Sequence, residues 1–408
     1  MPRPLSVLAL IALAACGNDP SGPEAPPRQY LYLWTAAADG TQPDFLAVLD
    51  VTERDDRYGR LVTTLPVPGR GNGNHHTEHE MPADGQLFAN GFESGQTFVF
   101  DLREREQPRI AAQFGDVEGY SHPHTFVRLP NGNVLATFQM RHAHDGGDGM
   151  RTGGLVEMTP AAAAVRSHSA DFEGADPSMR VYSAAVVPAF DRIVTTTTDM
   201  HGDSPASRNI QVWRLGDLAL QHTFALPDGP VGNEGLLTAE PRLLKDGKTV
   251  LVSTFRCGLY LLEGLDGDAP SGRLVASFPQ KEGEFCAIPV IAGDYYLVTV
   301  PAWSAVVSLD ISDPAAPREV SRVTLQPDDV PHWIAISPDH RRVVVTGYEG
   351  MQHQVLIARF DPATGQLSLD ERFREEGAVE AGFRMDDKSW PHGGDAKGIP
   401  HGAVFSRP

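Results

Sequence analysis

The stretch His124-Thr-Phe-Val-Arg-Leu-Pro-Asn-Gly132, followed directly by Asn133-Val-Leu-Ala-Thr137, decides the fold of this chain. An apolar run leads into a Pro-Asn-Gly turn and a second apolar run leaves it, which is typical of two antiparallel strands joined by a tight turn. Helical periodicity is nearly absent elsewhere, and short β-rich runs alternate with Gly, Pro, Asn and Asp. The stretch therefore predicts an all-β protein.

The same unit recurs along the chain. The other copies occupy residues 76–89, 182–195, 239–252, 286–299 and 332–346. Most copies continue into a third strand that ends near an acidic residue, such as Asp101 or Asp310, and then into a more polar fourth strand. Four antiparallel strands repeated every roughly 45–60 residues are typical of the blades of a β-propeller.

The two ends of the chain supply a seventh blade. Residues 400–405 resemble one more innermost strand, and residues 30–34, 45–50 and 61–65 provide the strands that this blade lacks. Pairing them closes the ring and leaves no exposed sheet edge. We therefore predict one seven-bladed β-propeller domain over residues 29–408. The alternative of two tandem β-sandwiches leaves the terminal half-blade unexplained.

The first residues indicate export. Arg3 precedes a short apolar run that ends in Leu13-Ala14-Ala15-Cys16-Gly17, the pattern of a bacterial lipobox. We expect residues 1–15 to be a lipoprotein signal peptide, and residues 16–28 to be a lipidated Cys16 with a proline-rich tether. The alternative is an ordinary secretory signal cut near Ala15. The expected location is the periplasmic side of a Gram-negative bacterium, held to the membrane only by the lipid anchor.

The composition limits which partners and how many disulfide bonds the protein can have. The net charge of −19 argues against nucleic acid or anionic lipid as a partner, and the apolar content of 41% is ample for a packed core. Cys257 and Cys286 are the only cysteines beyond Cys16, so a disulfide framework is excluded while a single bridge stays open. The sequence favours a buried, unreactive cysteine over a bridge or over a Cys286 thiol near a metal.

Aligning the repeats on their shared turn brings one position into register at the start of each innermost strand. This position holds His76, His124, Tyr182, Ala239, Cys286, His332 and His401. Innermost strands converge on the axis of a propeller, and four of the seven places are histidine although the chain has only 15. We expect His76, His124, His332 and His401 to meet there.

Converging imidazoles indicate a site for one transition metal, with copper first and iron or zinc as alternatives. The neighbouring His75, Glu78, His79, Glu80 and His122 are candidates to orient the ligands, and a member of the 75–80 run is an alternative to any one of the four. The simpler interpretation is a water-filled channel lined by histidines. It is less favoured, because imidazoles gathered at one spot repel one another when protonated.

Two loops could lie near the predicted histidine site. Arg141-His142-Ala-His144-Asp145 is expected on the same face of the ring as the histidines. Residues 375–398, which include Trp390-Pro-His392, are extra length between the sixth and seventh ring positions. This loop is expected either to cap the channel or to lie on the surface. No nucleophile elbow, phosphate-binding loop or zinc-protease helix is present in the sequence.

Several segments resemble the selenium-binding protein and methanethiol oxidase family. They are Tyr30-Leu-Tyr-Leu-Trp34, Asp44-Phe-Leu-Ala-Val-Leu-Asp50, Leu65-Pro-Val-Pro68 with His75-His76, His124-Thr125 through Gly132, and Asp310-Ile-Ser-Asp-Pro-Ala-Ala-Pro317. The likeness is strongest over residues 29–160. It carries over His75, His76 and His124, whereas His332 and His401 rest on the repeat register. The chain departs from the family where a cysteine-rich segment should follow His76, since it reads Thr77-Glu-His-Glu-Met81.

The resemblance implies a propeller and, for the bacterial oxidases, a periplasmic copper enzyme. Those enzymes convert methanethiol, dioxygen and water to formaldehyde, hydrogen sulfide and hydrogen peroxide. We therefore expect a metal-dependent oxidase of a small thiol, with selenium binding through the missing segment in doubt. The alternatives are a non-enzymatic periplasmic metal carrier, a non-haem iron oxygenase that uses four histidines, and an interaction scaffold without metal.

Overall fold

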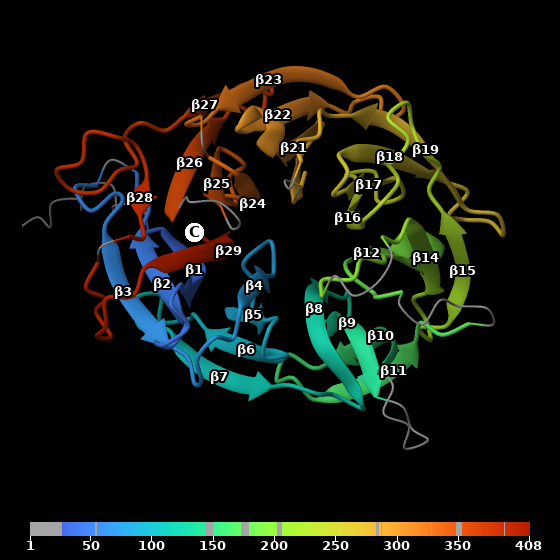
Figure 1. The fold of residues 1–408 in the computed structure, drawn as a ribbon, viewed down its shortest axis with the longest axis horizontal. Coiled ribbons are helices and arrows are strands. Elements are labelled where there is room, and N and C mark those ends of the chain that lie inside the picture. The colour runs from blue at the N-terminus through green and yellow to red at the C-terminus, as the bar shows by residue number, and fades with distance from the viewer. Residues whose placement is uncertain are drawn as a thin grey trace, which may run out of the picture.

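The computed structural model describes residues 27–53, 55–142, 150–172, 179–201, 206–282, 285–286, 288–327, 329–347, 353–386 and 388–408. These residues form a closed ring of seven antiparallel sheets, which confirms the predicted seven-bladed β-propeller (Figure 1). The predicted signal peptide (residues 1–15), Cys16 and most of the predicted tether (residues 16–28) lie outside the described residues. No helix in the described part of the chain is long and apolar enough to cross a membrane.

Six blades follow the order of the chain, each running from an innermost to an outermost strand. Blades 1 to 3 comprise β4(Asn74–Thr77), β5(Gln86–Gly91), β6(Gln96–Asp101), β7(Arg109–Phe114); β8(Tyr120–Arg128), β9(Val134–His142), β10(Met150–Met158), β11(Ala164–Ser169); and β12(Ala184–Val187), β13(Arg192–Thr196), β14(Asn209–Arg214), β15(Leu220–Ala225). Blades 4 to 6 comprise β16(Thr238–Leu243), β17(Val250–Thr254), β18(Gly258–Glu263), β19(Ser271–Ser277); β20(Pro289–Ala292), β21(Tyr295–Val300), β22(Ala305–Asp310), β23(Arg318–Thr324); and β24(Pro331–Ile336), β25(Arg342–Gly347), β26(Gln354–Phe360), β27(Leu367–Leu369). The 3₁₀ turns Pro188–Phe190 and Pro301–Trp303 are the helical elements of the described chain.

The two ends of the chain share blade 7, as predicted. Its innermost strand is β29(Gly398–Phe405), which pairs with β1(Tyr30–Ala37), followed by β2(Phe45–Asp50) and β3(Leu61–Pro66). The pairing of β1 with β29 is antiparallel and brings Tyr32 opposite Val404. Strands from the two ends of the chain therefore close the ring, and they lie side by side at the left of Figure 1.

Hydrophobic cores lie between neighbouring blades. On β1, Leu31 and Leu33 face blade 6 and pack in one cluster with Trp333, whereas Tyr32 and Trp34 face blade 1 and pack in another. Side chains of a strand alternate between the two faces of its sheet, so each blade contributes to two cores at once. Each large apolar side chain buried in this way stabilises the fold by about 1.5–3 kcal/mol.

The described parts of the extra loop, residues 375–386 and 388–398, lie at the outer side of the ring (Figure 1). A short strand within it, β28(Phe383–Arg384), pairs with β26. Trp390 is buried against Phe45, with ring centres 4.6 Å apart, and His392 Nδ1 lies 2.7 Å from the hydroxyl of Thr64. The loop covers strands β2 and β3 of blade 7, so of the two expectations the surface loop describes it and the channel cap does not.

Candidate metal centre

The aligned ring position falls on the innermost strands, or within three residues before them, throughout the propeller. His76, His124, His332 and His401 lie on β4, β8, β24 and β29, which are consecutive around the ring (Figure 1). Ala239 lies on β16, whereas Tyr182 and Cys286 lie two and three residues before the first residues of β12 and β20. The histidines therefore occupy one contiguous arc, and the other three positions form the opposite arc.

Hydroxyls on the second strands bind the backbone of the aligned residues and hold them at the same level along the propeller axis. A threonine of one blade donates to the backbone carbonyl of the ring residue in the next blade in four pairs: Thr137 to Tyr182, Thr196 to Ala239, Thr299 to His332, and Thr346 to His401. In blade 1, Asn90 takes this part, because its amide accepts from the His76 N–H and donates to the carbonyl of Pro123. These bonds tie each innermost strand to its neighbour.

Three histidines form the compact part of the centre. His75, His76 and His124 each offer a ring nitrogen, and these three atoms lie within 4.8 Å of one another. The His75 and His76 rings stack 4.2 Å apart, and the His124 ring centre lies 4.3 Å from that of His76. All three side chains are buried. Such a spacing allows one ion to contact all three imidazoles.

His401 and His332 extend the cluster. The ring centre of His401 lies 4.5 Å from that of His75, and His332 lies 4.8 Å from His401. His401 is fully buried, whereas His332 keeps part of its surface accessible. The predicted quartet thus does not form the compact group by itself. His75 joins His76 and His124 in the compact trio, with His401 beside it and His332 at the margin.

Gly402 permits the close approach of β29 to β4. A Cβ at this position would lie 2.7 Å from the backbone nitrogen of Thr77 and 2.9 Å from the carbonyl oxygen of His75. Any larger residue would push the two strands apart. The glycine after His401 therefore lets the histidines of blade 7 and blade 1 meet.

Burial keeps the clustered imidazoles neutral. Desolvation lowers the pKa of His124 to about 3 and that of His332 to about 4. For His75, His76 and His401, burial and then the neighbouring histidines place the pKa well below its usual value. A neutral imidazole has a lone pair available for a metal ion.

The hydrogen bonds of His124 identify which of its nitrogens carries that lone pair. Its Nδ1 lies 2.9 Å from the backbone carbonyl oxygen of Tyr182, which only accepts, so Nδ1 carries the proton. Nε2 is then an acceptor, and it is buried with no hydrogen-bond partner among the described residues. An acceptor of this kind is costly unless something binds it. A backbone carbonyl that fixes the tautomer is a common arrangement for metal-binding histidines, so the residues present fit a metal ion.

Glu78, His79 and Glu80, which the sequence suggested as residues that orient the ligands, lie in different surroundings. Glu78 is buried, but its carboxylate binds Arg128 at 2.6 Å and the Phe88 N–H at 3.0 Å, and desolvation raises its pKa to about 7. Glu80 is exposed. The ring of His79 stacks on that of Trp333 at 4.5 Å, and its Nε2 accepts from Arg242 at 2.9 Å.

His122 lies beside the cluster in a separate group. Its ring contacts those of Phe92 and His201, with centres 5.9 and 5.0 Å away. Burial and the neighbouring His201 lower its pKa. His142 is exposed at the end of β9, where it pairs with Asp116 at 2.7 Å, and His144 lies outside the described residues.

Tyr182, Glu240 and Arg242 are neighbours of the cluster that the histidine pattern did not reveal. The Tyr182 hydroxyl lies 3.4 Å from His76 Nε2. Glu240 is fully buried, with Oε1 4.0 Å from His76 Nδ1 and Oε2 2.6 Å from Arg242. A sequence signal existed, because Glu240-Pro-Arg242 places two opposite charges directly after the aligned position of a strand expected to be buried.

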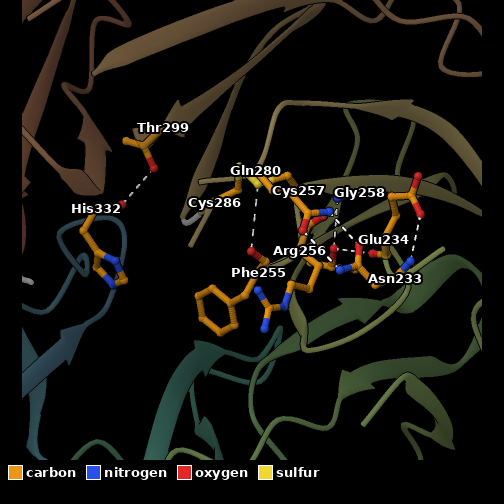
Figure 2. The surroundings of a disulfide bond; sticks show 11 residues. Asn233, Glu234, Phe255, Arg256, Cys257, Gly258, Gln280, Cys286, Thr299 and His332 are labelled. Atoms are coloured by element: carbon orange, nitrogen blue, oxygen red, sulfur yellow. Dashed lines mark hydrogen bonds between the residues drawn. A yellow bond between two sulfur atoms is a disulfide. The ribbon is translucent and has the colours of Figure 1, made fainter. Parts of the chain in front are cut away.

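Cys257 and Cys286 form a disulfide bond (Figure 2). Both residues are buried, in a core formed between blades 4 and 5. The expected burial is therefore confirmed, the expectation of an unbridged cysteine is wrong, and the bridge left open by the sequence is present. Because its sulfur is bonded to another sulfur, Cys286 offers no thiolate to a metal.

A cavity of about 570 Å³ occupies the axis beyond the cluster, towards the carboxyl ends of the innermost strands. Its lining includes His79, Thr125, Arg128, Val186, Arg242 and Ile336, but none of the five clustered histidines. Thr125 follows His124 directly, and His79 stacks on the tryptophan that follows His332. The cavity thus lies next to the centre, although the clustered histidines are not part of its lining.

Comparison with known proteins gives one relative in sequence and many in fold. The chain is 26% identical to a methanethiol oxidase from a Hyphomicrobium species over 218 residues, about half of the length of each protein. Its fold matches a hypothetical selenium-binding protein from Sulfolobus tokodaii with a TM-score of 0.74 at 18% identity, covering 94% of both chains. A periplasmic gluconolactonase of Pseudomonas aeruginosa matches with a TM-score of 0.62 at 13% identity, covering 94% of this chain and all of the other. No family model matches the sequence.

These findings support the predicted family resemblance at the level of distant similarity. The structural matches show the fold alone. The sequence match is to an oxidase, and the described residues contain three histidines that could hold one metal ion.

Proposed function

We propose that this protein is a metal-dependent oxidase of a small thiol such as methanethiol, with copper as the most suitable metal. The observation that carries the proposal is His124, whose carbonyl-bound Nδ1 leaves a buried, unpartnered Nε2 within the histidine trio. The sequence similarity to a methanethiol oxidase supports thiol as the substrate class. Imidazole ligands suit copper, iron and zinc, and copper and iron can also exchange electrons with dioxygen.

In this proposal His75, His76 and His124 hold the ion, and His401 is the nearest further ligand. A bound copper ion would supply a site for thiolate and a route for electrons to dioxygen. The chain itself supplies neutral imidazoles and, through Tyr182 and Trp333, a wall that excludes water. Aliphatic residues such as Val186 and Ile336 line the axial cavity together with the charged Arg128 and Arg242, so a small thiol would meet both apolar and polar groups there.

A metal carrier without turnover is the second candidate. It is favoured because none of the clustered histidines lines the axial cavity, and a carrier needs no substrate pocket at the ion. The two candidates share the ligands and differ in whether a thiol reaches them.

We further propose that the protein is exported and tethered through a lipidated Cys16 on the periplasmic side of the membrane. The lipobox pattern supports this proposal. The Cys257–Cys286 bridge is also expected for an oxidising compartment. Mass spectrometry of the protein purified from membranes tests it: a diacylated Cys16 at the mature N-terminus supports the proposal, and a soluble protein cut elsewhere contradicts it.

Metal analysis of the purified protein, together with oxygen uptake in the presence of methanethiol, tests the enzymatic proposal. We expect about one copper per chain and thiol-dependent oxygen uptake, both lost in His124→Ala. The exposed His142→Ala is the matched control and should keep both. Copper or zinc without turnover supports the carrier, iron supports an iron oxygenase, and the absence of any metal contradicts the site.

A further inference from the structure

We propose that Glu240 is a positioning residue that fixes the orientation and tautomer of His76 for metal binding. This inference rests on the metal site proposed above and adds a carboxylate that neither the histidine pattern nor the similarity to known proteins assigns. Glu240 lies on β16 of blade 4, across the axis from His76 on β4 of blade 1. Its side chain is fully buried.

The first argument concerns two atoms without partners. Glu240 Oε2 accepts from the hydroxyl of Ser183 at 2.7 Å and from Arg242 at 2.6 Å. Glu240 Oε1 has no hydrogen-bond partner among the described residues, and neither has His76 Nδ1. These two atoms lie 4.0 Å apart. Both are costly to bury unpaired, so a small movement that joins them is favourable.

The second argument comes from another buried carboxylate of the same propeller. Glu78 also pairs with an arginine, but both of its oxygens are occupied, Oε1 by the Arg128 Nε at 2.6 Å and Oε2 by the Phe88 N–H at 3.0 Å. Glu240 keeps one oxygen out of its arginine pair and directs it towards an imidazole. A carboxylate present only to neutralise Arg242 would not need that arrangement.

The arginine fixes the carboxylate in place. Besides Glu240, Arg242 donates to the backbone carbonyl of Pro289 at 2.9 Å and to His79 Nε2 at 2.9 Å. With its guanidinium held from three sides, Arg242 compensates the buried charge and limits the rotation of the Glu240 side chain. Oε1 is thereby held facing His76.

The consequence for His76 is a defined tautomer. A proton on Nδ1 directed at Glu240 Oε1 leaves the lone pair on Nε2, the nitrogen beside the Tyr182 hydroxyl. A carboxylate behind a ligating histidine makes the ligand more basic and typically contributes 10–100-fold in metal affinity. Glu240 thus does for His76 what the Tyr182 carbonyl does for His124.

Glu240→Gln tests the inference. Because Arg242 donates only, the glutamine oxygen will turn towards it and the amide N–H₂ will face His76 Nδ1. That arrangement favours the wrong tautomer. We expect the affinity for Cu²⁺, measured by competition with a chelator, to fall about 10–100-fold, with an altered electron paramagnetic resonance spectrum of the bound Cu²⁺. Glu78→Gln, which alters another buried glutamate paired with an arginine, should change neither.

Glu240→Asp keeps a charge for Arg242 but draws the carboxylate back from His76, so its affinity for Cu²⁺ should fall between those of the wild type and Glu240→Gln. If Glu240→Gln does not fold, the Cu²⁺ affinity of Glu240→Asp is compared with that of Glu78→Asp, and a lower affinity of Glu240→Asp supports the role of Glu240. Equal affinities and spectra for the Glu240 and Glu78 variants would overturn the role of Glu240 while leaving the metal site standing. A wild-type protein that binds no Cu²⁺ would overturn both.

Discussion

The two arcs of the ring differ in what one position carries. From blade 6 through blades 7, 1 and 2, the aligned residue is histidine each time, whereas blades 3, 4 and 5 carry Tyr182, Ala239 and Cys286. The backbone is alike in both arcs, because second-strand threonines hold the aligned carbonyls in each. The difference indicates that both arcs share one kind of scaffold, and that the histidines of the candidate site come from one arc alone.

The largest expected effect separates the arcs by metal binding. His124→Ala removes a ligand from the compact trio, and we expect metal affinity to fall more than about 100-fold with the loss of oxygen uptake. Ala239→Ser alters the same position in the opposite arc and should leave metal content at the wild-type level. The measurement is bound metal per chain after dialysis. Equal metal content in both variants would break the comparison.

The second effect separates the arcs by stability. The disulfide of the opposite arc closes a loop with a sequence separation of 29 residues, so Cys257→Ser with Cys286→Ser should lower the free energy of unfolding by about 3–4 kcal/mol. Metal affinity should stay unchanged, because neither sulfur reaches the histidines. Denaturant unfolding and a Cu²⁺ titration of the double variant check both statements. A loss of affinity in the folded double variant would show that the arcs are coupled.

Two residues of the histidine arc should make the stability of the metal-free protein depend on pH in opposite directions. Between pH 6.5 and about 3, the unfolded chain binds a proton that folded His124 does not, so this residue makes the metal-free protein less stable as pH falls. Between pH 4.5 and about 7, folded Glu78 keeps a proton that the unfolded chain releases, so this residue makes it less stable as pH rises.

Each of these groups contributes up to about 1.4 kcal/mol per pH unit within its window. His124→Gln should therefore make the free energy of unfolding rise less steeply between pH 5 and 6.5, and Glu78→Gln should make it rise more steeply. Chemical unfolding of metal-free protein across this range measures both slopes. Changes of the same sign in the two variants would contradict the assignment.

The smallest effect concerns the second-strand threonines, which bind aligned carbonyls in both arcs. Thr346→Val and Thr196→Val each remove a hydrogen bond to an aligned carbonyl, worth about 1 kcal/mol of stability. Of these two carbonyls, the one held by Thr346 belongs to His401 and the one held by Thr196 belongs to Ala239. We therefore expect Thr346→Val, and not Thr196→Val, to weaken Cu²⁺ binding as well, by a few-fold. Thermal unfolding and chelator competition compare the pair, and equal binding in both would show that this support is not needed.

The fold could be predicted almost completely from the sequence, because its physical basis is local. Strand, turn and strand recur with the same turn residues, and the alternation of Leu31 and Leu33 with Tyr32 and Trp34 follows from the geometry of a strand. The unpaired strand at residues 400–405 pointed to the blade that both ends share. The register of the repeats likewise placed the histidines on innermost strands.

The membership of the site could be predicted only in part, because register fixes the height of a residue and not the direction of its side chain. His332 shares the register of His124 yet contacts the group through His401, whereas His75, one residue out of register, stacks on His76. Cys257 lies outside the aligned position, so its bridge to Cys286 depended on a three-dimensional approach. Glu240 comes from the arc that carries no histidine.

The shared blade has a consequence for when the centre can exist. His401 lies on β29, which follows every other described strand in chain order and pairs with β1, the first of them. During synthesis, His75, His76 and His124 emerge long before the strand that brings His401 beside them. Closure of the ring and completion of the histidine group are thus a single event, and the spectrum of a bound metal would serve as a clock for the last step of folding.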